Sequence, residues 1–517
     1  MQHTASQTMT QAWDEAAARF RFAGVATLII AVAGYAAWLS PFDDLLDRSG
    51  TPLGGDYVML YVAGQAISSG QTATLYDDYQ NQLRSRKLIP QMDPDESWPY
   101  RYPPTVAVCM VPLSWLPFAT SYAVFLAIQI CLLAGAVYFM RQQSQALRNR
   151  PAWVFAIVGC PLVLETLMGG QSSLLALAIV TAYFHFFRRQ QHAVAGAILA
   201  LGLYKPNVLW LVILASLMVR PKLLRGFAPM AGLGLAVAWW ATGLEGILSY
   251  VELATQLASN SWGLETPYWK VHGLASYFEW LVPKRGRMLC TLAGVILSIC
   301  VAGGWRWKGI SDHAALALLL AFGGLLNPYV PIYDLVLLIA ALVYAVEAYQ
   351  VAGAPHPSPI GFQSLAAILF LGPHLSQTLC SASRIQLFPL LLALICVAGL
   401  VAVLRQTFRN RRRCVGLCDR VGSLFSLNRL THWQPHVAIS GISSVAALLK
   451  RLPTLSCGLQ VRERLRLFFP IATTRIRPRK GLAKSRKHTK VEANRGLPLH
   501  GQGSMTCDFV EPAKSKW

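Results

Sequence analysis

The feature that most constrains this chain is a succession of long apolar segments joined by shorter polar loops. Hydrophobic residues occupy 54% of the 517 positions, and charged residues occupy only 14%. The mean hydropathy of the chain, +0.42, is higher than that of a water-soluble protein of this size, whose surface must be largely polar. Because a helix satisfies its own backbone hydrogen bonds in lipid, the sequence predicts an all-α polytopic membrane protein.

The first apolar segment, Phe22 to Leu39, is long enough to cross a hydrocarbon core of roughly 30 Å. No small-residue cleavage site follows it, so we expect a retained helix and not a signal peptide. Lys and Arg in the later short loops mark the cytoplasmic side. These marks predict about 12 transmembrane helices with both termini inside, at 22–40, 119–140, 152–167, 172–187, 193–204, 207–219, 226–243, 289–303, 312–326, 335–347, 363–379 and 386–404.

Charge divides the chain into an expected cytoplasmic amino terminus (1–21), a membrane domain (22–404) and a tail (405–517). The tail holds 23 Lys and Arg against 5 Asp and Glu, so +18 of the total net charge of +22 lies there. Periodic hydrophobicity is largely lost in the tail, which predicts a mostly disordered segment whose basic clusters contact anionic lipids. Nucleic acid is not expected as a partner, because no nucleic-acid-binding module is visible.

The eleven cysteines are scattered without a framework spacing. We therefore expect neither a disulfide scaffold nor a cysteine metal site, and no cofactor. Acids of the outer loop could bind a metal ion, but no ligand spacing indicates one.

The large first outer loop, 41–118, is rich in acidic residues, as the positive-inside bias permits. Within it an apolar stretch from Tyr102 to Leu116 is too short to span a bilayer. It predicts a helix at the outer interface, with the whole loop acting as a lid.

Two predicted helix pairs are interrupted by polar or Gly/Pro residues, at Met168 to Gln171 and at Tyr204 to Asn207. Broken backbone at membrane depth requires protein or water to satisfy the freed groups. Both breaks fall on the outer side in the predicted topology. They indicate one cavity that opens outward, although short helices also pack together without any chemical role.

Asp56 follows two glycines just beyond the first helix, with Tyr61 at helical spacing after it. A carboxylate at the mouth of a cavity can accept a proton from an attacking hydroxyl. The alternative is that Asp56 is one acid among many in this loop.

Lys205 interrupts an otherwise apolar stretch, 193–218, and an ionisable residue in such a segment usually has a function. Its compact ammonium group can bind phosphate, or it can extend to the outer interface. Asp334 closes a polar turn that begins at Asn327, and it can pair with Lys205 or cap a helix. Gln171 can hydrogen-bond a sugar or phosphate, or satisfy the helix break.

A collinear set of motifs extends over roughly residues 50 to 345. It consists of Gly55-Asp56-Tyr57 with Tyr61 and Ala63, Leu75-Tyr76, Tyr102-Pro103-Pro104, Gly170-Gln171, Ala195-Gly196 with Lys205-Pro206, and Asn327-Pro328-Tyr329 with Tyr333-Asp334-Leu335. In order and spacing this set resembles glycosyltransferase family 87.

The resemblance implies a GT-C-like membrane bundle that moves mannose or a related sugar from a polyprenyl-phosphate carrier to a hydroxyl of a glycolipid, glycan or other acceptor, with inversion. It implies that Asp56 is the catalytic base and that Lys205 contacts the donor phosphate. The other expected substrate-binding residues are Gln171, Arg101, Tyr61, Tyr102, Asn327, Tyr333 and Asp334. Arg101 and Tyr329 depart from the commoner family residues at their positions.

The same resemblance implies a multi-pass protein of the bacterial cytoplasmic (inner) membrane with its active site on the periplasmic face. The alternative from another class is a multi-spanning transporter or lipid flippase, which also uses broken helices around a buried charge. The two halves of the chain show no convincing internal repeat, which favours the enzyme.

Overall fold

The computed structural model describes residues 2–401 except 39–44, 49, 94–97, 260–269, 276, 279–281, 283–284, 308, 328, 352–358 and 384–385. These residues form helices and connecting segments, with an isolated β-bridge between Leu46 and Pro52 and no longer strand. The predicted all-α class is confirmed. The tail 405–517 lies outside the described residues, as do parts of 22–40, of the outer loop 41–118 and of 386–404.

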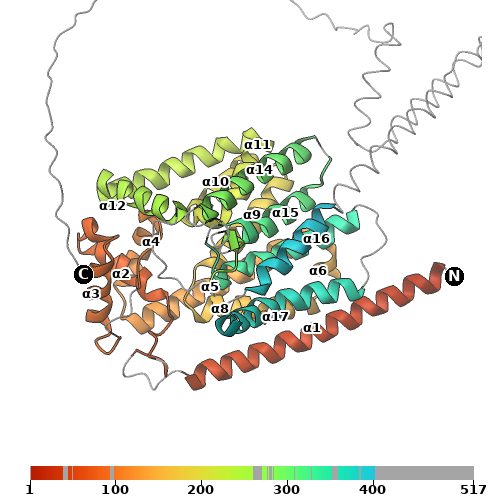
Figure 1. Ribbon diagram of the computed structural model, residues 1–517, viewed down its shortest axis with the longest axis horizontal. Coiled ribbons are helices and arrows are strands. Elements are labelled where there is room, and N and C mark those ends of the chain that lie inside the picture. Colours follow the sequence, from red (N-terminus) through yellow and green to blue (C-terminus); the bar gives the residue numbers. More distant parts are fainter. Residues whose placement is uncertain are drawn as a thin grey trace, which may run out of the picture. The chain divides into compact units, whose positions relative to one another are not determined.

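Two long helices border the helical body. Figure 1 shows α1 (Gln2–Trp38) along one side, next to α17 (Pro359–Ser383). Helix α1 also packs against α7 (Ala152–Val158). On the other side α12 (Leu224–Ser259) packs against α10 (His192–Leu201) and α4 (Pro104–Ser114).

Five described helices are long and apolar enough to cross a membrane: Gln11–Ala37, Phe118–Gln143, Pro221–Leu257, Gly286–Arg306 and Ile332–Gln350. They include α5 (Phe118–Gln143) and α14 (Gly286–Arg306). The predicted crossing at 363–379 lies within α17 (Pro359–Ser383), and the remaining predicted crossings coincide with shorter helices, among them Leu387–Val401. The membrane character is thus supported, whereas the number of 12 crossings stays a prediction.

The predicted helix at 152–167 is divided into α7 and α8 (Pro161–Met168). Cys160 between them has extended backbone angles, because the ring of the following proline disfavours a helical conformation in the residue before it. Gly159 also meets Gly24 of α1 so closely that a Cβ atom at either residue would collide with backbone of the other helix. Small residues at this crossing let the two helices approach.

Both predicted breaks are present. After α8 ends at Met168, Gly170 adopts a positive φ of 62°, and α9 begins at Ser173 and ends at Arg188. The second break follows α10 and the 3₁₀ turn η2 (Gly202–Tyr204); Lys205 is non-helical and α11 (Pro206–Val219) begins after it.

The outer segment contains α2 (Tyr57–Ser68), η1 (Thr72–Thr74), α3 (Asp78–Leu88) and α4. Helix α4 confirms the predicted short helix after Tyr102. Nine of the twelve residues of α2 are buried, and Gly64 lies directly against the backbone of Met110 in α4. The beginning of this segment is therefore part of the packed core, and its action as a lid stays a prediction.

The last site-forming region follows α15 (Asp312–Leu326) and comprises η5 (Ile332–Val336) and α16 (Leu337–Val351). A short segment, 270–275, lies beside it: the His272 amide donates to the Val330 carbonyl at 2.8 Å, and the Leu274 amide donates to the Leu325 carbonyl at 2.9 Å. These bonds fix the segment close to the turn that carries Tyr333 and Asp334.

Candidate active site

Two pairs of glycines bring Asp56 to the first helix break. Gly54 and Gly55 have φ values of 76° and 53°, a left-handed conformation that glycine adopts without strain. They turn the chain so that the Asp56 amide donates to the Gly169 carbonyl at 3.2 Å. A side chain at Gly170 would collide with Gly54, so this contact between the two segments requires glycine.

Asp56 precedes α2, but its side chain makes no capping hydrogen bond. Its carboxylate instead accepts hydrogen bonds from Nε2 of Gln171 and from the hydroxyl of Tyr333. Asp56 keeps part of its surface accessible. The carboxylate is therefore oriented by two neighbours, in a residue that is only half-buried.

The protein around Asp56 shifts its acidity. Burial raises the pKa of Asp56 to about 6, and the positive charges of Lys205 and Lys270 and the hydrogen bond from Tyr333 act in the opposite direction. A carboxylate with this pKa is mostly ionised at neutral pH and is a stronger base than an ordinary aspartate.

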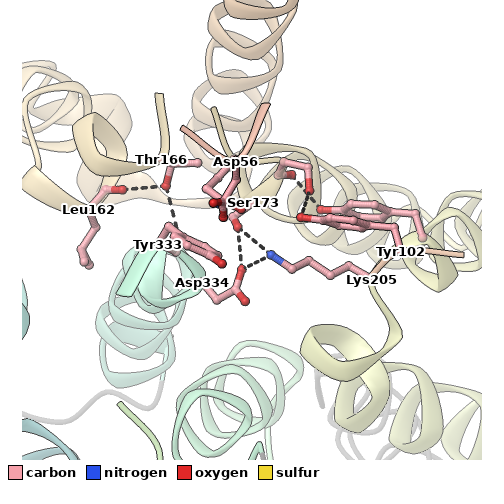
Figure 2. Close-up of polar contacts among 11 residues, drawn as sticks. Asp56, Tyr102, Leu162, Thr166, Ser173, Lys205, Tyr333 and Asp334 are labelled. Atoms are coloured by element: carbon pink, nitrogen blue, oxygen red, sulfur yellow. Dashed lines mark hydrogen bonds and ion pairs between the residues drawn. The ribbon is translucent and has the colours of Figure 1, made fainter. Parts of the chain in front are cut away.

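Beside Asp56 lies a buried ion pair (Figure 2). The Lys205 ammonium group donates to Oδ1 of Asp334 at 2.5 Å and to the Ser173 hydroxyl at 3.1 Å, and that hydroxyl donates to the same Asp334 oxygen at 2.5 Å. Lys205 is 7% exposed and Asp334 4%. Of the two predicted roles of Asp334, the structure shows the pairing with Lys205.

Aromatic side chains complete the surroundings of the ion pair. The Lys205 nitrogen lies 4.9 Å from the ring centroid of Tyr333 and 5.8 Å from that of Tyr102, distances typical of cation–π contacts. Tyr102 accepts a hydrogen bond from the Ser172 hydroxyl at 3.1 Å, and Tyr204 donates to the Ser172 carbonyl at 2.8 Å. The two helix breaks are thereby tied together, and the cavity that they were predicted to share stays a prediction.

Two buried oxygen atoms in this cluster have no hydrogen-bond donor among the described residues: Oε1 of Gln171 and Oδ2 of Asp334. Buried polar atoms are nearly always paired in native proteins. Both atoms can only accept hydrogen bonds, so a ligand rich in hydroxyl groups is suited to them.

Three of the predicted site residues make other contacts. The Tyr61 hydroxyl donates to the Leu116 carbonyl at 2.8 Å, and Arg101 forms a bidentate ion pair with Asp78, with both distances 2.9 Å. The Asn327 side chain accepts from the Tyr329 amide at 3.0 Å. These residues support the elements around the cluster, while Asp56, Tyr102, Gln171, Lys205, Tyr333 and Asp334 form it.

The structure adds residues that we did not predict from the sequence. Ser173 bridges the ion pair, and its place two residues after Gln171, at the start of α9, is a signal that could have indicated it. Lys270 is exposed and interacts electrostatically with Asp56 and with Glu165 of α8. It lies in a polar stretch of the sequence where nothing distinguishes it. Across the described part of the chain, no group of three or more His, Cys, Asp or Glu forms a candidate metal site.

Comparison with known proteins finds no matching curated protein and no matching solved structure. A family model does match, over residues 100–328. The matched segment includes Tyr102, Gln171 and Lys205, whereas Asp56 and Asp334 lie outside it. The match favours an enzyme over the transporter alternative. It confirms the resemblance seen in the motifs: residues 100–328 match glycosyltransferase family 87, which indicates a membrane glycosyltransferase.

Proposed function

We propose that this protein transfers a sugar, with mannose as the first candidate, from a polyprenyl-phosphate carrier to an acceptor hydroxyl. The transfer inverts the configuration of the sugar. The protein is a polytopic component of a bacterial cytoplasmic membrane, and its site faces the periplasm, because the helix breaks fall on the side opposite the Lys- and Arg-rich loops.

The observation that carries this proposal is the arrangement around Asp56. The carboxylate of the half-buried residue Asp56, held by Gln171 and Tyr333, stands beside a buried cation and two acceptor atoms without donors. This combination provides a base for a hydroxyl, a positive charge for a phosphate and acceptors for sugar hydroxyl groups. A purely structural ion pair would not require a base, a cation and hydroxyl acceptors in the same place.

The reaction needs one base. The acceptor oxygen attacks the anomeric carbon while its proton passes to Asp56. A new bond forms between the acceptor oxygen and the anomeric carbon, and the bond between that carbon and the phosphate oxygen breaks. The electron pair leaves with the polyprenyl phosphate, which requires no proton to depart. Attack opposite the leaving group inverts the anomeric carbon, whereas retaining glycosidases use a second carboxylate as nucleophile.

Lys205 contributes positive potential toward the donor phosphate. Its ammonium group is fixed by Asp334 and Ser173, so it is oriented before the substrate arrives. Preorganised charge of this kind stabilises the transition state without a cost in reorganisation. Arg101 is paired with Asp78, so the phosphate contact expected from it is not part of this proposal.

Gln171 and Asp334 are suited to recognise the sugar. Their unsatisfied oxygen atoms, Oε1 and Oδ2, can accept hydrogen bonds from two hydroxyl groups of the transferred sugar. A site built around such acceptors rejects a sugar analogue that lacks the corresponding hydroxyl, because the buried oxygen then stays without a partner.

The test is a comparison of donors with purified protein in lipid vesicles. Polyprenyl-phosphate mannose, other polyprenyl-phosphate sugars and nucleotide sugars are each supplied with a panel of glycolipid and glycan acceptors. We expect transfer from a polyprenyl-phosphate sugar and a product of opposite anomeric configuration, assigned by NMR. Transfer from nucleotide sugars only, or a product that retains the donor configuration, would contradict the proposal.

A further inference from the structure

Two cations act on Asp56, and they differ in accessibility. Lys205 is buried and bound to Asp334 and Ser173. Lys270 is exposed. Both interact electrostatically with the Asp56 carboxylate. A negatively charged group close to Asp56 therefore feels one cation that is buried and one that solvent reaches.

The position of Lys270 is set by the backbone. It lies two residues before His272, whose amide is bound to the Val330 carbonyl at 2.8 Å. Val330 is three residues before Tyr333, the side chain that contacts Asp56. The short 270–275 segment thus holds Lys270 next to the turn that forms one wall of the site.

A second acidic residue, Glu165, also interacts electrostatically with Lys270. Glu165 lies one helical turn before the end of α8. The Gly169 amide donates to the Glu165 carbonyl at 2.9 Å, and the Gly169 carbonyl accepts from the Asp56 amide at 3.2 Å. Three segments distant in sequence therefore bring Asp56, Glu165 and Lys270 within electrostatic reach of one another.

We propose that Lys270 is a phosphate-binding residue, which holds the lipid phosphate of the donor from the open side while Lys205 acts from the buried side. This inference rests on the proposed function, because it assigns a role in the same site. It assigns the first contact with the substrate to an exposed ammonium group, and leaves the buried ion pair intact. Glu165 and Asp56 attract Lys270 to the site before the substrate arrives.

The phosphate group becomes more negative during the reaction, which strengthens its contact with a cation. The donor is a phosphodiester with one negative charge. The departing polyprenyl phosphate is a monoester, which carries about −1.5 to −2 at neutral pH, as other phosphate monoesters do. A cation at Lys270 therefore binds the leaving group more strongly than the donor, and such differential binding accelerates the reaction.

A binding experiment tests Lys270 without sugar transfer. The ligands are polyprenyl phosphate and the matching polyprenyl alcohol, which differ only in the phosphate group, and the proteins are the parent, Lys270→Ala and Lys270→Arg. Lys222→Ala is the matched control, because Lys222 is also exposed but lies in the predicted cytoplasmic turn η3 (Pro221–Leu223). Intrinsic tryptophan fluorescence reports the binding of each ligand.

We expect the parent and Lys222→Ala to bind polyprenyl phosphate at least tenfold more tightly than the alcohol. Lys270→Ala should lose most of that preference while its affinity for the alcohol is unchanged, and Lys270→Arg should restore it. An undiminished preference in Lys270→Ala would overturn the inference.

Transfer assays separate this inference from the proposed function. Transfer by the parent, combined with an unchanged kcat/KM in Lys270→Ala, would refute the role of Lys270 and leave the function standing. A phosphate preference that depends on Lys270, in a protein that transfers no sugar from any polyprenyl phosphate, would refute the function and leave the phosphate site standing.

Discussion

At the scale of single residues, the chemistry depends on the different surroundings of two charged groups. Asp56 and Lys205 stand in one polar cluster, yet their partners differ. Lys205 forms an ion pair with Asp334, whereas the Asp56 carboxylate accepts hydrogen bonds from the uncharged groups of Gln171 and Tyr333. A base must take up a proton and release it during turnover, so a carboxylate without an ion-pair partner suits this role. A fixed electrostatic group needs a permanent counterion, which suits Lys205.

The acidity of Asp56 gives a pH dependence for the transfer. Because the base must be ionised and burial raises its pKa to about 6, kcat/KM should rise about tenfold per pH unit below pH 6 and level off above it. The positive charge of Lys270 lowers this pKa. Lys270→Ala should therefore move the inflection of the pH profile to higher pH. A profile that is flat between pH 4.5 and 7.5 would show that another group accepts the proton.

The ion pair gives a prediction about stability. Asp334→Ala leaves the ammonium group of Lys205 buried without a counterion, and breaking a buried pair in this way costs about 3–5 kcal/mol. Replacing both residues, as Lys205→Met with Asp334→Leu, should restore much of the lost thermal stability but no sugar transfer. Thermal unfolding in detergent measures the first effect. Equal stability of the single and double variants would contradict this description of the pair.

At the scale of elements, two helix breaks and one tight turn create the site. Each break places backbone and polar side chains where a continuous helix would present only an apolar surface. The Asp56 turn then joins the first break through Gly169 and Gly170. These contacts decide where the Asp56 carboxylate lies relative to Gln171.

Gly170→Ala should disrupt the site without touching a reactive group. Alanine at a φ of 62° is strained by about 1 kcal/mol or more, and its Cβ atom would collide with the Gly54 carbonyl. We expect at least a tenfold loss of transfer activity and a lower melting temperature.

Gly135→Ala in α5 is the control for Gly170→Ala, because a Cβ atom at Gly135 meets open space. It should retain activity and stability. A fully active Gly170→Ala would show that the close contact between the two turns is dispensable.

The sequence predicted the elements of the site better than its contacts. Each glycine or proline in the breaks leaves a local mark, so the breaks and the residues within them, Gln171 and Lys205, were recognisable. The division of the 152–167 helix was missed although Pro161 lies inside it, because apolar periodicity continues on both sides. Side-chain partners depend on packing between distant segments.

The contacts of Arg101 illustrate that limit. A sequence-based expectation placed its guanidinium group on a phosphate, but the fold brings Asp78 of α3 to it. Tyr61 likewise lies at helical spacing from Asp56, yet its hydroxyl reaches the Leu116 carbonyl. Lys270 shows the opposite case: an unremarkable position in the sequence lies within electrostatic reach of Asp56 in the structure.

At the scale of the whole molecule, the proposal requires the site to face away from the cytoplasm. The basic loops that define the predicted inside include Arg148 in α6 (Gln145–Asn149), and the predicted outer loop includes Asp93. Both side chains are exposed. In an active variant without native cysteines, Asp93→Cys should react with a membrane-impermeant maleimide on cells with a permeabilised outer membrane, and Arg148→Cys should not. The reverse labelling would place the site in the cytoplasm.

The central claim is that Asp56 is the base of a lipid-linked sugar transfer, and Asp56→Asn tests it most directly. Asparagine preserves the size of the side chain but cannot take up the proton. Asp93→Asn is the control, since it removes an exposed acid of the same outer loop outside the Asp56 cluster. The measurement is the turnover number with radiolabelled polyprenyl-phosphate mannose, alongside the affinity for polyprenyl phosphate. The expected result is at least a hundredfold loss of turnover in Asp56→Asn with binding retained, and parental turnover in Asp93→Asn. Full turnover in Asp56→Asn would contradict the claim.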